Sequence, residues 1–343
     1  MVSHVERDLT LRPAHAEDVR ALQAMVDADA ADRWTRVLYD GGRSAVSRAG
    51  AGLEVVERDG AVIGLVEART DPVSGTVELG WWIEPAQRGR HTASRVVRLA
   101  VDEALRSGVP RVEARVATAN HSSRWVAASA GLRLEAGLHE AWDDDTVAGG
   151  RLDVEVWRLV AGEAPLDGQP DLTAGVLHLR PLAPSDADAL ARGMDDGSVR
   201  RWLHHTPIPY GREDALAYVA GTLGSWAAGT GAVWGFCDST TGELLGCAGL
   251  HGRRPDPLWR ELGWHCFPWA RGRGHTARAV GAVARWGRGA LGLTRVDARI
   301  EIDNAPSQRV AADAGLVHEA TLEAAVTARD GRAVTAQVWR WAG

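Results

Sequence analysis

The stretch WARGRGHTAR, residues 269–278, places three arginines and two glycines within ten residues. It follows a run with strand character, ELGWHCF (261–267), and precedes a segment with apolar residues at helical spacing. The start of a helix offers unpaired N–H groups and the positive end of the helix dipole. Glycines let the backbone close on an oxyanion. The stretch therefore predicts a phosphate-binding turn before a helix over 275–290. The alternative is a solvated basic turn.

The chain contains an internal repeat. RVEARVATANHSSRWVAASAGL (111–132) matches RVDARIEIDNAPSQRVAADAGL (295–316), and ELGWW (78–82) matches ELGWH (261–265). Between the two copies lies AGEAPLDGQPDLTAG (161–175), whose Pro, Gly and Asp content is typical of a linker. We expect an N-terminal domain over 1–162, a linker over 163–176 and a C-terminal domain over 177–343.

The pattern of the second half predicts a mixed α/β layer fold. A strand at 176–182 is followed by a helix that begins near Ser185 as N-cap and by a second helix over 211–229. Three strands, a helix, a strand, a helix ending at Gly315 and two final strands complete the order. The first half follows the same order.

Composition sets limits on function. The formal net charge is −6, which argues against a nucleic-acid partner. Cys237, Cys247 and Cys266 lack metal-ligand spacing and are expected to be free thiols. No apolar run suits a signal peptide or a membrane span. We expect a cytoplasmic protein without a metal or a membrane partner; the composition also permits a homodimer.

The two motifs together resemble the GNAT superfamily of N-acetyltransferases, in particular its ribosomal-protein alanine acetyltransferase branch. The first motif is Arg271-Gly272-Arg273-Gly274-His275-Thr276, with Thr276 where Gly or Ala is usual. The second is Asn304-Ala305-Pro306-Ser307, ahead of Gly315-Leu316. The resemblance covers nearly the whole chain twice. It implies two tandem GNAT-like acyl-CoA N-acyltransferase domains that use acetyl-CoA as cosubstrate.

The same resemblance implies roles for individual residues. The amides from Arg271 through Gly272, Arg273, Gly274, His275 and Thr276 to Ala277 would hold the diphosphate of acetyl-CoA. Asn304 would bind the pantetheine arm, and the strand end at Cys266 and Phe267 would meet the thioester carbonyl. The tyrosine that many relatives use to protonate the leaving thiolate falls on Ala311 and Ala127. The Asn-x-x-Ser branch points to Ser307 instead. For Ser307 the alternative is a hydroxyl bonded to backbone, and for Asn304 an Asx turn.

Two residues are candidate bases. Glu261 and His265 alternate onto one face of the same predicted strand, and an unperturbed histidine titrates near neutrality. A surface glutamate and a packed histidine are the alternatives. Glu319 could also face the acceptor. The acceptor cleft is expected to be walled by RRWLHHTPIPYGRED (200–214), and WDDDTV (142–147) could attract a cationic amine or form a solvated hairpin tip.

The two halves differ in the phosphate-binding turn. The first half reads Arg88-Gly89-Arg90-His91-Thr92 and lacks a counterpart of Gly274. A shortened turn loses backbone donors, and the loss of two charge-assisted bonds would weaken binding by about 10²- to 10⁴-fold. We expect catalysis in the C-terminal half and a degenerate N-terminal half.

Several readings of function remain open at this point. Gly272-x-Gly274-x-x-Ala277 also satisfies the dinucleotide fingerprint, but the four residues PWAR and the preceding antiparallel pattern do not suit it. The leading expectation is an acetyl-CoA-dependent N-acetyltransferase whose acceptor is a small-molecule amine or a peptide N-terminus. The alternative is a non-catalytic tandem acyl-CoA-binding sensor or scaffold.

Overall fold

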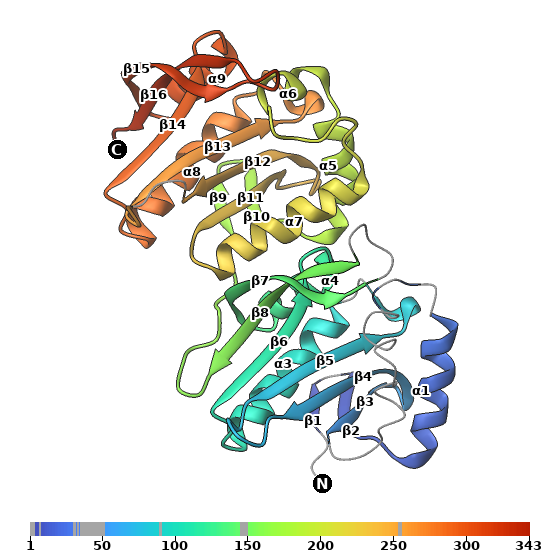
Figure 1. The fold of residues 1–343 in the computed structure, drawn as a ribbon. Coiled ribbons are helices and arrows are strands. Elements are labelled where there is room, and N and C mark those ends of the chain that lie inside the picture. The colour runs from blue at the N-terminus through green and yellow to red at the C-terminus, as the bar shows by residue number, and fades with distance from the viewer. Residues whose placement is uncertain are drawn as a thin grey trace. The chain divides into compact units, whose positions relative to one another are not determined.

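A computed structural model describes residues 4–6, 8–29, 32, 34, 52–88, 91–144, 150–252 and 256–343. The chain divides into two compact units, Met1–Gly168 and Gln169–Gly343 (Figure 1). Gly89 and Arg90 of the N-terminal turn and residues 145–147 of the WDDDTV segment lie outside the described residues. Leu172–Ala174, within the expected linker, forms a strand of the second unit.

The described part of the N-terminal unit forms a mixed sheet in the order β1-β2-β3-β4-β5-β6-β8-β7. Only β5 and β6 pair in parallel. The elements are β1 (His4–Glu6), β2 (Leu9–Pro13), α1 (Ala16–Ala28), β3 (Leu53–Arg58), β4 (Ala61–Thr70), β5 (Val77–Ile83), α3 (Thr92–Arg106), β6 (Arg111–Ala117), α4 (His121–Ser129), β7 (Arg133–Asp143) and β8 (Arg151–Val160).

The C-terminal unit has the corresponding sheet, in the order β15-β16-β14-β13-β12-β11-β10-β9. Its elements are β9 (Leu172–Ala174), β10 (Leu177–Pro181), α5 (Ala187–Met194), α6 (Gly197–Trp202), α7 (Arg212–Ala227), β11 (Gly231–Asp238), β12 (Leu244–His251), β13 (Trp259–Cys266), α8 (His275–Ala290), β14 (Arg295–Glu301), α9 (Ala305–Asp313), β15 (Leu316–Thr327) and β16 (Ala333–Trp341). The mixed α/β fold and its duplication are confirmed.

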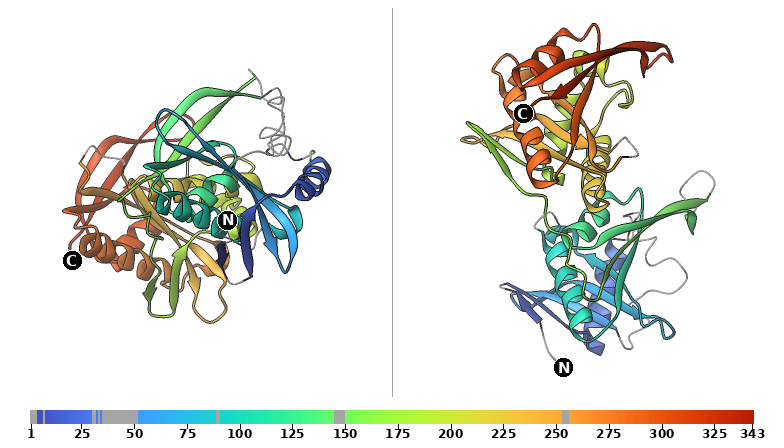
Figure 2. Two further views of the ribbon diagram at one scale, coloured as in Figure 1. Left: turned by 90° about the horizontal axis from the view of Figure 1, so that it is seen from below. Right: turned by 90° about the vertical axis from the view of Figure 1, so that its left-hand side faces the viewer.

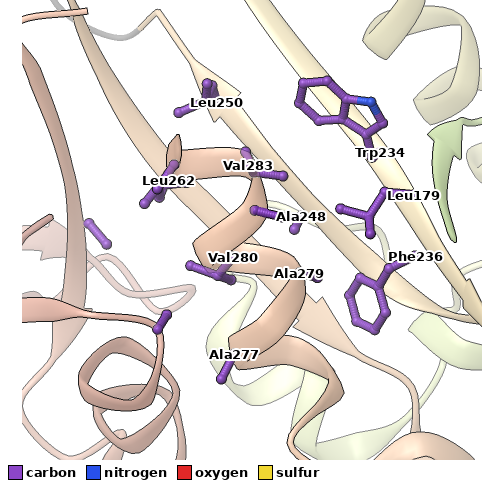
Figure 3. Close-up of a cluster of buried hydrophobic side chains, with 14 of the residues drawn as sticks. Leu179, Trp234, Phe236, Ala248, Leu250, Leu262, Ala277, Ala279, Val280 and Val283 are labelled. Carbon is purple, nitrogen blue, oxygen red and sulfur yellow. The ribbon is translucent and has the colours of Figure 1, made fainter. Parts of the chain in front are cut away.

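Helix α8 packs against one face of the C-terminal sheet. Its buried residues Ala279, Val280 and Val283 meet Trp234 and Phe236 of β11 (Figure 3). Burial of each large apolar side chain contributes about 1.5–3 kcal/mol. Because successive strand residues point to opposite faces, the neighbouring Val233 faces the other side, where it lines a cavity together with residues of α7. The views in Figure 2 show the helices of each unit lying against its sheet.

Strands β13 and β14 separate soon after they meet. Their parallel pairing covers Trp259 to Glu261 against Arg295 to Asp297 and continues no further in the described ladder. Strand β13 stays paired with β12 on its other side up to Cys266. The separation leaves the second half of β13 with backbone groups that no neighbouring strand uses on the β14 side, and it opens the sheet beside the start of α9.

Candidate functional site

The turn between β13 and α8 combines a glycine-rich segment with the start of a helix. A single 3-10 turn, Pro268–Ala270, leads from β13 into the glycine-rich segment. Gly272 and Gly274 have φ values of 76° and 71°, a left-handed conformation that costs other residues about 1–2 kcal/mol. Gly274 is the N-cap of α8. Within the described residues, the backbone N–H groups of 274–277 donate no hydrogen bond, as expected for a first helical turn.

His275, the first residue of α8, adds a second unsatisfied group at this place. Its side chain is 9% exposed and its Nδ1 has no hydrogen-bond partner. Burial, with further contributions from Arg278 and Arg273, lowers the pKa of His275. A buried ring nitrogen without a partner next to free helical N–H groups is costly unless a ligand satisfies it. Thr276 and Ala277 are buried beside it, and Ala277 belongs to the core.

The two arginines of the turn have different surroundings. Arg271 Nη2 donates to Asp196 Oδ1 at 2.6 Å, and Asp196 also accepts from the backbone N–H groups of Ser198 and Val199 as the N-cap of α6. Hydrogen bonds from Ser198 and Arg271 hold the pKa of Asp196 below its usual range. Arg273 is exposed and forms no ion pair with any described residue. Arg273 is therefore the arginine that is available to an anion.

The end of β13 offers one of the two expected backbone donors. Phe267 N–H donates to Leu245 O at 2.9 Å, so the expectation that Phe267 meets a ligand carbonyl through its amide is wrong. In an antiparallel ladder the donors alternate sides, so the N–H groups of Trp264 and Cys266 point away from β12. Cys266 therefore keeps a free N–H on the side where β13 and β14 separate. Burial raises the pKa of its thiol.

A cavity of about 740 Å³ lies in the C-terminal unit and brings together four of the sequence-predicted residues: Glu261, His265, Asn304 and Ser307. Segment 202–207, with Tyr210 and Asp214, forms one wall, as the sequence predicts. Residues 325–327 of β15 form another. The remaining sequence-predicted residues, Cys266, Phe267 and 271–277, lie at the end of β13 and the start of α8, outside the cavity lining.

Neither candidate base is a free base near neutral pH. Glu261 Oε2 accepts from Arg299 Nη2 at 3.0 Å, and its side chain is 12% exposed. Burial lowers the pKa of His265 to about 4, so the expected titration near neutrality is wrong. His265 Nε2 is buried without a partner, and its ring packs against Tyr218 and Phe267 at centroid distances of 6.4 Å and 5.4 Å.

Asn304 and Ser307 have a structural role that both units share. Asn304 is the N-cap of α9, and its Oδ1 accepts from Ser307 N–H at 3.2 Å. Asn120 accepts from Ser123 N–H at 3.1 Å in the same way. Asn-x-x-Ser is thus a helix cap in each half. The Ser307 hydroxyl forms no hydrogen bond with a described residue and lines the cavity, so it remains available for chemistry.

Several cavity residues escaped sequence reasoning. Glu301 of β14 pairs with His204, and Tyr218 of α7 has a hydroxyl without a hydrogen bond to any described residue. Burial raises the pKa of Tyr218 well above its usual value. No local motif marks these residues, since their partners are distant in sequence. Glu319, by contrast, is exposed, pairs with Arg295 and Arg340 and is absent from the cavity lining.

The N-terminal counterpart of the turn is built differently. His91 takes the N-cap position of α3 with φ 57°, where α8 has Gly274. Its ring lies 5.1 Å from that of Trp125 between centroids. Since one residue is missing, a histidine with a Cβ occupies the left-handed cap. Arg88 pairs with Asp29, as Arg271 pairs with Asp196.

Two searches of the described residues gave negative results. No cluster of three or more His, Cys, Asp or Glu side chains suitable for a metal ion is found there. None of the described helices combines the length and the apolar character that a membrane crossing requires.

Comparisons with known proteins place these features in a family. A family model described as Acetyltransferase (GNAT) domain matches residues 8–133 and again 177–317. An uncharacterized N-acetyltransferase, YoaA, of Bacillus subtilis (strain 168) is 26% identical over 153 residues, which cover 45% of this chain and 86% of the relative.

Solved structures of similar proteins each match about half of the chain. A putative ribosomal-protein-serine acetyltransferase from Vibrio cholerae has 18% identity and a TM-score of 0.44, covering 50% of this chain and 97% of its own. A ribosomal-protein-S5-alanine acetyltransferase from Vibrio fischeri has 16% identity and a TM-score of 0.44, covering 51% and 100%. The family matches span most of the sequence, and the chain therefore belongs to the GNAT acetyltransferase family, with two tandem domains.

Proposed function

We propose that this chain transfers the acetyl group of acetyl-CoA to a primary amine and that the C-terminal domain performs the reaction. The observation that carries the proposal is the start of α8. There, residues 272–277 combine two left-handed glycines with four backbone N–H groups that donate no hydrogen bond within the described residues. Such a site suits a diphosphate, because helical N–H groups and the helix dipole favour negative charge. Arg273 adds a free guanidinium.

The path from this site to the cavity follows the separated strands. The free N–H of Cys266 lies on the β14 side of β13, where it could polarise a thioester carbonyl. Asn304 and Ser307 lie at the start of α9 on the cavity lining. In this arrangement a bond forms between the amine nitrogen and the acetyl carbon, and the carbon–sulfur bond breaks. The Ser307 hydroxyl gives its proton to the leaving thiolate.

Proton removal from the amine needs no strong base in this proposal. Glu261 is paired with Arg299, and His265 is neutral above pH 4 with a free Nε2. A neutral amine that enters the cavity releases its proton only after attack. His265 and water can pass that proton to the Ser307 oxygen, which restores the hydroxyl that protonated the thiolate. We propose that His265 acts as a relay and that Glu261 holds the shape and charge of the cavity.

The N-terminal domain is proposed to be degenerate. The cap of α3 is His91, whose ring lies tilted against that of Trp125, so a histidine with a Cβ stands where α8 has Gly274. A tandem sensor without catalysis is the second candidate function, and it is favoured by the weak basicity of His265.

Thiol release from acetyl-CoA in the presence of a panel of amines and peptide N-termini separates the two functions. Amine-dependent release supports the enzyme. Tight binding of acetyl-CoA without release by any acceptor supports the sensor. No binding of acetyl-CoA contradicts both.

A further inference from the structure

Two buried carboxylates face the cavity, one from each of the separating strands. Glu261 of β13 is paired with Arg299, and Glu301 of β14 is paired with His204, whose Nε2 lies 2.6 Å from Glu301 Oε1. The Glu261 and Glu301 side chains are only 12% and 13% exposed. All four residues line the cavity. Burying a charged carboxylate without a partner costs free energy, and in each pair the partner side chain offsets that cost.

The two pairs differ in how strongly the partner holds the carboxylate. A guanidinium is always charged and donates several hydrogen bonds in a fixed plane, whereas an imidazole is a weaker partner whose charge depends on its protonation. Arg299 also donates to Ala325 O at 3.5 Å, which anchors it between β14 and β15. His204 lies in the loop after α6 and holds Glu301 through one contact. Glu301 is therefore the carboxylate that an incoming cation can take over.

The reacting nitrogen cannot be that cation. An amine attacks a thioester only when it is neutral, and a carboxylate that binds its ammonium form opposes the reaction. Asp214 also lines the cavity, and its Oδ2 accepts from Gly211 N–H at 2.8 Å in the cap of α7. A carboxylate placed in the acceptor cavity thus fits a second positive charge on the acceptor, other than the amine that reacts.

The cavity wall also limits the size of the acceptor. Arg329, in the turn after β15, donates to Thr206 O at 2.8 Å and to Leu203 O at 2.9 Å. This contact joins the β15–β16 hairpin to the loop after α6, which the hairpin approaches in Figure 1. Segment 203–207 and residues 325–327 both line the cavity, so Arg329 closes the wall between them. A space of about 740 Å³ lies in the range of small-molecule sites.

Together these contacts identify a substrate class. We propose that the acceptor is a small-molecule diamine and that Glu301 is its specificity-determining residue: one ammonium replaces His204 at Glu301 while the other amine, neutral, reacts near His265 and Ser307. The inference rests on the proposed acetyltransferase function. Tyr218, Leu203 and Val326 line the same cavity and give it apolar and aromatic surface that suits a methylene chain.

The test uses the full chain, acetyl-CoA and thiol release. Four- and five-carbon α,ω-diamines are compared with monoamines of the same length. We expect kcat/KM to be about 10- to 100-fold higher for the diamines, the value of one charge-assisted contact. Glu301→Gln should remove this preference. Glu319→Gln, an exposed paired carboxylate outside the cavity, is the matched control and should keep it. Thermal melting checks that each variant folds.

A second variant covers the case in which Glu301→Gln does not fold. His204→Ala frees the carboxylate, so KM should fall for the diamines and stay unchanged for the monoamines. Three results would overturn this inference and leave the acetyltransferase function standing. They are equal kcat/KM for diamines and monoamines, a preference for diamines that survives Glu301→Gln, and turnover with peptides alone. Binding of acetyl-CoA with no turnover of any amine would overturn the proposed function, and the diamine inference with it.

Discussion

The guanidinium of Arg271 lies 2.6 Å from the carboxylate of Asp196 and so ties the turn before α8 to the cap of α6. Arg88 pairs in the N-terminal domain with Asp29, the C-cap of α1, and there the cap of the following helix is His91 instead of a glycine. Because an arginine–aspartate contact is kept in both halves, whether the helix cap is glycine or histidine, we expect it to have a structural role. Anion binding then falls to Arg273 and to the backbone of α8.

This division of roles predicts different losses for the two arginines. Arg271→Ala should lower the free energy of unfolding by up to about 1 kcal/mol, the usual value of a partly exposed ion pair. Asp196→Ala should cost about 1–2 kcal/mol, because it removes the cap of α6 as well. Arg273→Ala should leave stability unchanged and weaken acetyl-CoA binding by about 10-fold. Chemical denaturation and titration calorimetry measure the two quantities. If only Arg271→Ala weakened acetyl-CoA binding, Arg271 and not Arg273 would be the arginine that binds the anion.

The left-handed cap predicts that Gly274 cannot be replaced cheaply. Gly274→His should destabilise the fold by about 1–2 kcal/mol, since the Cβ is strained at φ 71°. It should also lower acetyl-CoA affinity by obstructing the turn. His91→Gly is the matched exchange in the N-terminal domain and should leave affinity unaffected. Equal affinity in Gly274→His and the wild type would show that the diphosphate is held elsewhere.

The free hydroxyl of Ser307 predicts a purely kinetic defect. Ser307→Ala should lower kcat by about 100-fold, the range of a lost proton donor, while KM for acetyl-CoA stays close to that of the wild type. Its capping contact uses the backbone N–H, which the substitution keeps. Ser123→Ala occupies the same place in the N-terminal domain and serves as control. If both variants retain full kcat, the serine has only its capping role.

The buried ring of His265 predicts how stability depends on pH. Its folded pKa of about 4 is below the unfolded value of 6.5, so the unfolded chain binds the proton more readily. The stability that the neutral ring allows is complete above pH 6.5 and is lost as pH falls towards 4, by at most about 3 kcal/mol. His265→Phe removes this titration. Between pH 6.5 and 4 the wild type should lose up to about 3 kcal/mol of unfolding free energy relative to His265→Phe, and a constant difference between the two proteins would refute the cause.

Local patterns predicted the parts of the fold that local physics decides. Helix α8 spans His275–Ala290, as its apolar spacing indicates, and Gly315 follows α9 with φ 92°. Ser185 was wrong as a cap: Pro184 starts a 3-10 turn, and Asp186, held by Arg180, takes the N-cap position of α5. Helix α6 was missed because it is short, although Asp196 before Gly197 and Ser198 is a capping signal.

The candidate site was predictable only where its residues share a motif. The phosphate-binding turn and Asn304 with Ser307 are read from adjacent positions. Glu301 meets His204 across 97 residues, and Arg329 reaches Leu203 across 126, so no sequence spacing reveals them. The depressed pKa of His265 likewise follows from burial, which the alternation of one strand does not show. Contacts between residues that lie this far apart in the sequence can be identified only from the tertiary structure.

Calorimetric titration of the full chain with acetyl-CoA tests the central claim most directly. If acetyl-CoA binds at the start of α8, we expect one molecule to bind per chain. Binding should be lost when Gly274 is deleted and kept when His91 is changed to glycine. Two molecules bound per chain, or one that survives the deletion of Gly274, would contradict it.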